Sequence, residues 1–248
     1  MIIDAHVHVG TSQFLQIDAD AAQLVAIADE VGFDRICVTH ITALYYAMRE
    51  GNDALGADLA RWGERIVGYV TIPTHRLERE ACDEIRRCVD HYGMRGVKMY
   101  SHPESPITEA GATAIFETAA ALKLPILGHF TPTECDILMQ RVPEASVLMA
   151  HMGGQPYALG NWHLAVEVAG RHPNLNLDTA SSQIDNGMIE HAVERLGADK
   201  VVFGTDTPLL DPWVQRAKIE GADIDEAAKR LILGGNIARL MGLQTDAV

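Results

Sequence analysis

The chain opens with Met1-Ile-Ile-Asp-Ala-His-Val-His-Val-Gly10, a run in which apolar and polar residues alternate. Alternation with a period of two predicts a β-strand, because successive side chains of a strand point to opposite faces. The polar face would hold Asp4, His6 and His8, opposite Ile3, Ala5, Val7 and Val9. Two imidazoles on one face, two residues apart, can converge on one ion. The segment therefore predicts a first strand that carries either half of a metal site or two polar residues that face solvent.

Seven further apolar runs follow, and each precedes a segment with helical periodicity. They recur roughly every 25 to 33 residues, the spacing of repeated strand-helix-strand units. The runs are residues 35–40, 66–72, 96–100, 125–130, 146–151, 175–179 and 201–206. Eight such units predict an α/β fold, a (β/α)8 TIM barrel that forms a single domain over residues 1–248. The alternative, an open doubly wound sheet, is disfavoured because no strand is followed by Gly-x-Gly-x-x-Gly.

Two helix starts are indicated by capping patterns. Thr133 precedes Glu134 and Asp136, and Asp223 stands three residues before Glu226. A short polar residue followed by an acidic one in the first turn is typical of a capping box. We therefore expect helices to begin at these two positions.

Composition limits the partners of the protein. Its formal net charge of -14 opposes attraction to nucleic acid or to anionic lipid, so we expect a small-molecule substrate. The apolar runs are too short to span a membrane, and no basic region precedes an apolar leader, which predicts a cytoplasmic protein. Self-association into a homo-oligomer is compatible with this composition. Reduced thiols are expected of the four cysteines, Cys37, Cys82, Cys88 and Cys135.

Polar residues gather where the expected strands end. In a (β/α)8 barrel the carboxyl ends of the strands form the mouth, and catalytic groups lie there. The residues at these ends are His6, His8, His40, Lys98, Tyr100, His129, His151, Asp178 and Asp206. A single histidine at a strand end is more often a hydrogen-bonded core residue than a ligand. Several imidazoles and a carboxylate at one mouth instead predict a metal site.

Five segments resemble the amidohydrolase superfamily, and the whole chain is similar to its amidohydrolase-related branch, which includes the aminocarboxymuconate-semialdehyde decarboxylase group. The segments are Asp4-Ala-His-Val-His8, Gly96-Val-Lys98, Leu127-Gly-His129, Ala150-His-Met-Gly-Gly154 and Phe203-Gly-Thr-Asp-Thr-Pro208. The resemblance implies a mononuclear site with His151 beside the ion and four ligands: His6, His8, His129 and Asp206. Imidazoles and a carboxylate suit Zn²⁺, the ion we expect first, and also Mn²⁺, Fe²⁺ or Ni²⁺.

The remaining strand-end residues are candidates for other roles. Asp206 could move protons, and His151 could orient a nucleophile or polarise a carbonyl. Asp4, one pleat deeper than the ligands, is expected to support a ligand histidine. Lys98 could bridge two ions if carboxylated, but a cation for an anionic substrate is the favoured role. The other candidate pocket residues are Tyr100, His40, His102, Thr71 and Asp178.

Three functions are compatible with these residues. A hydroxide formed on the ion suits attack on a carbonyl, so we expect a hydrolase of a small lactone, ester or amide that bears a carboxylate. The alternative is a nonoxidative decarboxylase of a small carboxylic acid with the same metal site. The resemblance implies that decarboxylases of aromatic acids in this branch hold the carboxylate with such a cation, and no arginine follows closely after His8, which disfavours the decarboxylase. The third and weakest reading is a barrel that binds a metabolite or a metal without turnover.

Overall fold

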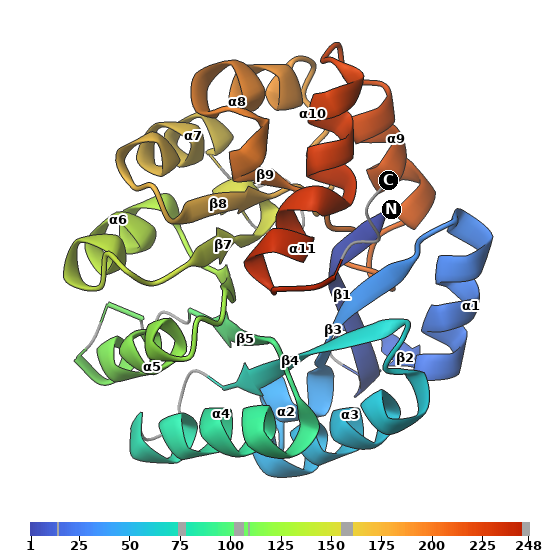
Figure 1. Cartoon of the computed structure of the whole chain (residues 1–248), viewed down its shortest axis with the longest axis vertical. Helices are drawn as coiled ribbons and strands as arrows, with labels where there is room; N and C mark the ends of the chain where they lie inside the picture. The colour runs from blue at the N-terminus through green and yellow to red at the C-terminus, as the bar shows by residue number, and fades with distance from the viewer. Residues whose placement is uncertain (14, 74–77, 102–106, 109, 155–160, 245–248) are drawn as a thin grey trace.

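The strands form a ring that helices surround in the computed structural model (Figure 1). The structure describes residues 1–13, 15–73, 78–101, 107–108, 110–154 and 161–244. One sheet runs in the order β2-β1-β3-β4-β5-β6-β7-β8-β9, and all of its pairs are parallel except β1 with β2. Eight parallel strands, each with its helical connection, confirm the predicted (β/α)8 barrel.

The strands and helices have the following bounds. The strands are β1 (Ile3–Ser12), β2 (Ile17–Ala19), β3 (Arg35–His40), β4 (Ile66–Ile72), β5 (Gly96–Tyr100), β6 (Ile126–His129), β7 (Val147–Met149), β8 (Leu175–Asp178) and β9 (Val201–Val202). The helices up to β8 are α1 (Ala21–Val31), α2 (Ile41–Tyr45), α3 (Met48–Trp62), α4 (Glu78–Tyr92), α5 (Ala110–Ala121), α6 (Pro132–Arg141), the 3-10 turn η1 (Ala150–Gly153) and α7 (Trp162–Arg171). After β8 come α8 (Met188–Leu196), η2 (Ala198–Lys200), α9 (Pro212–Glu220), α10 (Glu226–Arg230), the π-helical turn η3 (Leu231–Gly235) and α11 (Asn236–Leu240).

The ring closes between β1 and the segment that follows β9, residues 203–207. The Ala5 amide donates to the Phe203 carbonyl at 3.1 Å, and the Asp206 amide to the His6 carbonyl at 2.7 Å. The His8 amide donates to the Thr207 carbonyl at 2.8 Å. These bonds continue the sheet past the end of β9, so the first strand lies directly against Asp206.

The first strand changes face partway along its length. Ile3 and Ala5 belong to the apolar cluster inside the barrel, whereas Val7 and Val9 pack in the cluster beneath the surrounding helices. The pairing of β1 with β3 shifts register between Asp4 and Val7. An irregularity of this kind reverses the alternation of side chains. The expectation that all four apolar residues share one face is therefore wrong.

The last helix closes the amino-terminal end of the barrel. Ile237 and Ala238 of α11, with Met241, pack against interior residues such as Tyr69 and Leu127. Figure 1 shows α11 lying across this end, beside β1 and β9. The opposite, carboxyl end of the strands is left for the polar residues.

Both expected capping sites lie two residues from the observed ones. Thr131 caps α6, where its Oγ1 accepts from the Glu134 amide at 3.3 Å and its own amide donates to Glu134 Oε2 at 2.8 Å. Asp225 caps α10 by accepting from the Ala228 amide at 2.7 Å. Thr133 lies inside the first turn of α6, and Asp223 precedes the cap of α10.

All four thiols are buried and free, as expected for reduced cysteines. Within the described ranges, each helix is too short or too polar to cross a lipid bilayer.

Candidate metal centre

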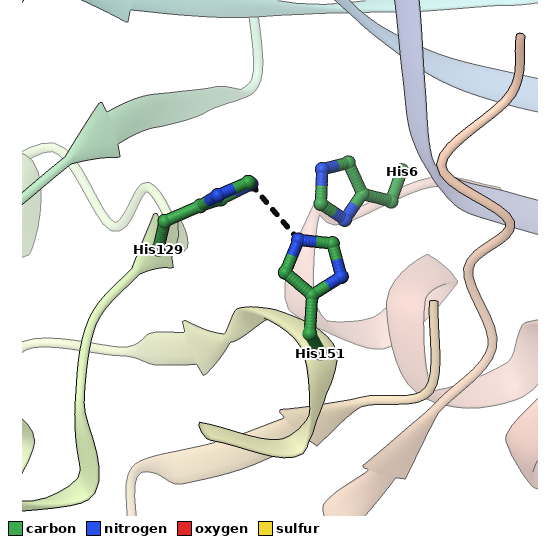
Figure 2. A group of neighbouring side chains, drawn as sticks. All are labelled: His6, His129 and His151. Carbon is green, nitrogen blue, oxygen red and sulfur yellow. Dashed lines mark hydrogen bonds between the residues drawn. The ribbon is translucent and has the colours of Figure 1, made fainter. Parts of the chain in front are cut away.

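Three histidines from three elements converge in the barrel mouth. Figure 2 shows His6 of β1, His129 of β6 and His151 of η1 pointing toward one another. The Nε2 atoms of His129 and His151 are 3.1 Å apart, and the ring centroids of His6 and His151 are 5.0 Å apart. One ring nitrogen from each residue lies within 4.8 Å of the others. Such a group can hold a metal ion.

A second group of donors shares His6 with the first. His8 Nε2 lies 2.9 Å from Asp206 Oδ1, and His6 Nε2 lies 3.5 Å from the same oxygen. These three side chains also offer donor atoms within 4.8 Å of one another, and all three are buried. The structure thus brings together the four residues expected as ligands and the histidine expected beside the ion.

Unusual backbone conformations aim two of these side chains. His151 and Asp206 have left-handed φ values of 55° and 63° where the chain turns away from β7 and β9. Such conformations cost energy for residues other than glycine and are often found at functional sites. Gly204 makes room for Asp178 and His6, because a Cβ there would lie 2.2 Å from Asp178 Oδ1 and 2.9 Å from the His6 Cβ.

Asp178 fixes the orientation of His6. Its Oδ2 lies 2.8 Å from His6 Nδ1, while Lys98 Nζ donates to His6 Nε2 at 2.8 Å. The nitrogen that accepts from the lysine carries the lone pair, so Nδ1 carries the proton and donates to Asp178. A carboxylate that binds the far nitrogen of a histidine is the usual support of a metal ligand. Burial raises the pKa of Asp178, against the hydrogen bonds from the Ala180 and His151 amides and the charge of Lys98.

Asp4 was expected to support a ligand histidine, and the structure shows that this expectation is wrong. Its carboxylate accepts from the amides of His6 at 3.0 Å and of Thr205 at 2.9 Å, and from the Thr205 hydroxyl at 2.5 Å. None of these contacts involves an imidazole. Burial raises the pKa of Asp4 to about 7, although these hydrogen bonds oppose the shift. Asp4 instead ties β1 to the closing segment.

Lys98 belongs to the cluster and does not line its rim. The side chain is fully buried, and its contact with His6 places a nitrogen among the proposed ligands. Burial lowers the pKa of Lys98 to about 7, against the attraction of Asp206 and Asp178.

The other expected pocket residues lie at different places. The Tyr100 ring packs on His129 with centroids 4.2 Å apart. His40 caps α2, where its Nδ1 accepts from the Thr42 amide at 3.2 Å. Thr71 Oγ1 accepts from the His40 amide at 3.3 Å. His102 lies outside the described residues.

Thr39 is a contact of the site that the sequence reasoning missed. Its Oγ1 lies 2.5 Å from His8 Nδ1, and the two residues are paired in the register of β1 and β3. A hydroxyl can both donate and accept, so Thr39 satisfies either tautomer of His8. Adjacent parallel strands could have suggested the pairing, but the register could not be read before the structure.

The donor set fits a divalent ion. Burial lowers the pKa values of His6, His8 and His129, and that of His151 to about 4, so the imidazoles are neutral at pH 7. Burial works against ionisation of Asp206, but the His8 hydrogen bond and nearby positive charges still lower the pKa of its carboxyl. Metal ligands must be deprotonated, as these are. Within the described part of the chain, two buried polar atoms of the cluster have no hydrogen-bond partner: His129 Nδ1 and Asp206 Oδ2.

Comparison with known proteins gives one family and two curated relatives. The profile of the family described as Amidohydrolase matches residues 3–243. An alignment 290 residues long with gamma-resorcylate decarboxylase of Polaromonas sp. gives 23% identity. It covers 94% of this chain and 83% of the relative. The chain is also 23% identical to the gamma-resorcylate decarboxylase of Rhizobium sp., with 71% of each chain covered.

Solved structures share the fold at low sequence identity. The 2,6-dihydroxybenzoate decarboxylase from Rhizobium aligns with a TM-score of 0.80 and 15% identity over 98% of both chains. The dihydroxybenzoic acid decarboxylase from Polaromonas sp., which holds bound manganese, aligns with a TM-score of 0.78 and 18% identity over 98% of this chain and 97% of that one. These likenesses confirm the barrel.

The comparisons confirm the resemblance drawn from the sequence and overturn the reaction expected from it. Both curated relatives are decarboxylases, so the expected hydrolase is wrong. The error came from the weight given to an arginine missing after His8. From the sequence, Lys98 is expected at the mouth as a cation for an anionic substrate, and the structure brings its buried amine into the cluster itself.

Proposed function

Because the chain belongs to the amidohydrolase family, we propose that it is a metal-dependent nonoxidative decarboxylase of a small aromatic carboxylic acid. The observation that carries the proposal is the buried cluster of four imidazoles, Asp206 and Lys98 at the mouth of a barrel that aligns end to end with aromatic acid decarboxylases. The fold alone would not fix the reaction.

Decarboxylation sets two requirements on the site. The bond between the ring carbon and the carboxylate breaks, its electron pair stays on the ring, and a proton must reach that carbon as CO₂ leaves. The site must therefore hold an anion and deliver one proton. A divalent ion held by His6, His8, His129 and Asp206 would supply positive charge for the oxygens of the acid.

Asp206 is the proposed proton carrier. Its Oδ1 is engaged by His8, whereas Oδ2 is buried without a partner in the described part of the chain. The lowered pKa makes the side chain a carboxylate before substrate enters. Oδ2 can then accept a proton from the incoming acid or its hydroxyl group and pass it to the ring carbon.

The neighbouring side chains bind and orient the acid in this proposal. Lys98 supplies the cation that an arginine would otherwise provide, and the Tyr100 ring beside His129 offers an aromatic wall. The His151 ring is held by its Nδ1, which donates to the Ala180 carbonyl, so its Nε2 faces the cluster.

The identity of the metal ion, the cellular location and the oligomeric state are proposals as well. The donors suit Zn²⁺ and Mn²⁺ alike, and metal analysis after growth with both ions identifies the resident one. A cytoplasmic location and a homo-oligomer remain predictions from the sequence.

The test is a panel of hydroxybenzoates that includes 2,6-dihydroxybenzoate and 5-carboxyvanillate, beside aliphatic acids, with CO₂ and the arene product both measured. We expect CO₂ and one equivalent of arene from an aromatic acid.

Asp206→Asn should lower kcat by about 10² to 10⁴-fold, because it removes the proton carrier. Asp211→Asn is the matched control, since Asp211 only caps α9 and asparagine caps as well. Failure of the metal-loaded protein to release CO₂ from any aromatic acid would refute the proposal.

A further inference from the structure

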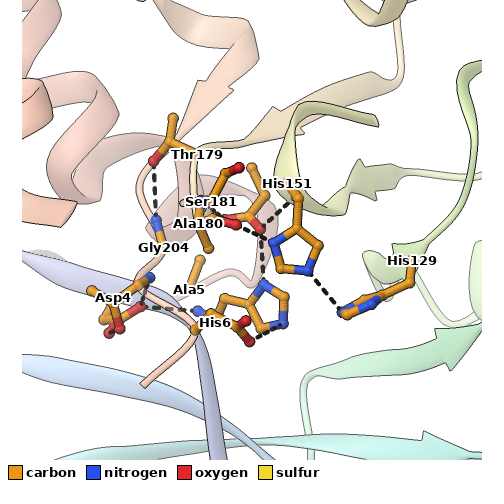
Figure 3. Close-up of polar contacts among 12 residues, drawn as sticks. Asp4, Ala5, His6, His129, His151, Thr179, Ala180, Ser181 and Gly204 are labelled. Atoms are coloured by element: carbon orange, nitrogen blue, oxygen red, sulfur yellow. Dashed lines mark hydrogen bonds and ion pairs between the residues drawn. The ribbon is translucent and has the colours of Figure 1, made fainter. Parts of the chain in front are cut away.

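The segment after β8 lies between the catalytic cluster and helix α9. Figure 3 shows Thr179, Ala180 and Ser181 beside His151. The Ala180 carbonyl accepts from His151 Nδ1, and the Ala180 amide donates to Asp178 Oδ1 at 3.3 Å. This short stretch of main chain therefore contacts both His151 and the carboxylate that supports His6.

Helix α9 holds the same segment from the other side. Lys218 Nζ donates to the carbonyls of Thr179 and Ser181, each at 2.8 Å. Gln215 Nε2 donates to the Ser181 carbonyl at 3.1 Å, and its Oε1 accepts from the Ser181 amide at 3.3 Å. The carbonyls on either side of Ala180 are thus fixed toward α9, while the Ala180 carbonyl is turned toward His151.

We propose that Lys218 and Gln215 are positioning residues, which set the ring orientation and the tautomer of His151 through the Ala180 carbonyl. The proposal extends the proposed function, in which His151 orients the substrate. A histidine whose Nδ1–H is held by a carbonyl keeps its Nε2 lone pair toward the reacting groups. Neither α9 residue touches the cluster itself, so their effect on it passes through the main chain.

The placement of Lys218 agrees with this role. Burial lowers the pKa of Lys218 to about 8, while the charge of Asp178 acts in the opposite sense. Lys218 is half-buried, and an ammonium group partly withdrawn from water is stabilised when it is hydrogen-bonded. Here both carbonyls that it satisfies flank the one residue that orients His151.

The chain provides a matched control in Lys200. Its Nζ also donates to two main-chain carbonyls, those of His172 at 2.6 Å and Pro173 at 3.0 Å. These residues precede β8, at the end of the strand away from the cluster. Loss of either lysine removes the same kind of contact, but only Lys218 is linked to His151.

The experiment compares Lys218→Met, Gln215→Leu, Lys218→Arg and Lys200→Met in the diamagnetic zinc-loaded protein. Nitrogen-15 NMR of the histidines detects the His151 Nδ1–H, assigned by its loss in His151→Asn. We expect the signal to disappear by exchange in Lys218→Met and Gln215→Leu and to persist in Lys200→Met. The kcat should fall about 10 to 100-fold in the first two with KM nearly constant, because misplaced groups slow the reaction. Lys218→Arg should recover the signal and most of kcat.

Two outcomes would overturn the proposal. One is a Lys218→Met protein that keeps the His151 signal and its kcat, and the other is an equal loss of both in Lys200→Met. The NMR measurement needs no turnover, so it decides the positioning role even if no aromatic acid is decarboxylated. If Lys218→Met does not fold, Gln215→Leu against Lys200→Met gives the same comparison.

Discussion

Both carboxylate oxygens of Asp178 accept hydrogen bonds, so even the replacement of the carboxylate by an amide should disturb the site. Oδ2 contacts His6 Nδ1 and the His151 amide, and Oδ1 accepts from the Ala180 amide. Asp178→Asn would set an NH₂ group against one of these donors. We expect metal affinity to fall about 10 to 100-fold, as for other supporting carboxylates.

Competition with a chromogenic chelator measures this effect on metal affinity. Asp136→Asn is the matched control, because Asp136 also holds a histidine, accepting from His172 Nε2 at 2.7 Å, but on the outer helices. Equal metal affinity in both variants would contradict the role given to Asp178.

His40 gives a pH dependence that is separate from the metal cluster. Burial lowers the pKa of His40 to about 4, against 6.5 for an exposed imidazole. The unfolded chain therefore binds the extra proton first as the pH falls. The contribution of neutral His40 is fully present above pH 6.5 and is lost as the pH falls toward 4, an effect of up to about 3 kcal/mol.

His40→Asn should flatten this dependence while keeping the cap of α2, since an asparagine oxygen can accept from the Thr42 amide. Urea unfolding from pH 8 to pH 4.5 measures the change. At pH 8 His40 is neutral in both states, so that point isolates the packing difference. Parallel curves for the two proteins would show that His40 does not contribute.

The sequence identified residues that can be recognised one at a time. It missed contacts between residues that lie far apart along the chain. Each proposed ligand could be identified as a candidate from its own strand end. The pairing of His6 with Asp178 joins residues 172 positions apart, and that of His8 with Thr39 joins residues 31 apart. Both depend on strand register, which periodicity does not report.

At the scale of single elements, α6 begins immediately beyond a proposed ligand strand. Thr131→Ala removes both the acceptor for the Glu134 amide and the reciprocal pairing, so we expect the free energy of unfolding to fall by about 1 kcal/mol. Thr133→Ala is the matched control, because Thr133 is exposed in the first turn and alanine favours helix. Chemical denaturation of both variants measures the difference, and an equal loss in the two would contradict the cap.

The strand boundaries show which element features a pattern of apolar residues can predict. The cores of the strands agree with the apolar runs, but β1 continues to Ser12 and β9 ends at Val202. The β1 extension pairs with β2, which no long apolar run signals. Residues 203–207 pair with β1 by irregular hydrogen bonds, because Asp206 leaves extended geometry to reach the cluster.

At the scale of the whole molecule, a bound ion would connect β1, β6 and the closing segment. An ion that binds only the folded protein stabilises it by about 2.7 kcal/mol at a concentration 100 times its Kd. We expect chelation to lower Tm by about 5 to 10 °C and readdition of the ion to restore it.

Two variants distinguish the ligands from the neighbouring histidine. His151→Asn should keep the shift in Tm on metal addition, whereas His129→Asn should lose most of it. The opposite result would exchange the roles of these two histidines. Calorimetry with and without the ion, supported by elemental analysis, gives the answer.

The fold was accessible from the sequence at this scale, and the reaction was not. Eight regular units leave few ways to arrange the chain. The same strand-end ligands serve hydrolysis and decarboxylation, so the choice depends on side chains whose contacts only the folded barrel defines, Lys98 above all.

The seam between β1 and residues 203–207 also sets an order of events during protein synthesis. A ribosome adds about 5 to 20 residues per second, so the 198 positions from His8 to Asp206 require about 10 to 40 s of translation. Throughout that time the nascent chain exposes a pair of imidazoles without the aspartate that completes their group. An incomplete set of ligands would hold a divalent ion less tightly than all four. We therefore expect an ion to be retained by the proposed ligands only when the ring closes, after the last strand has left the ribosome.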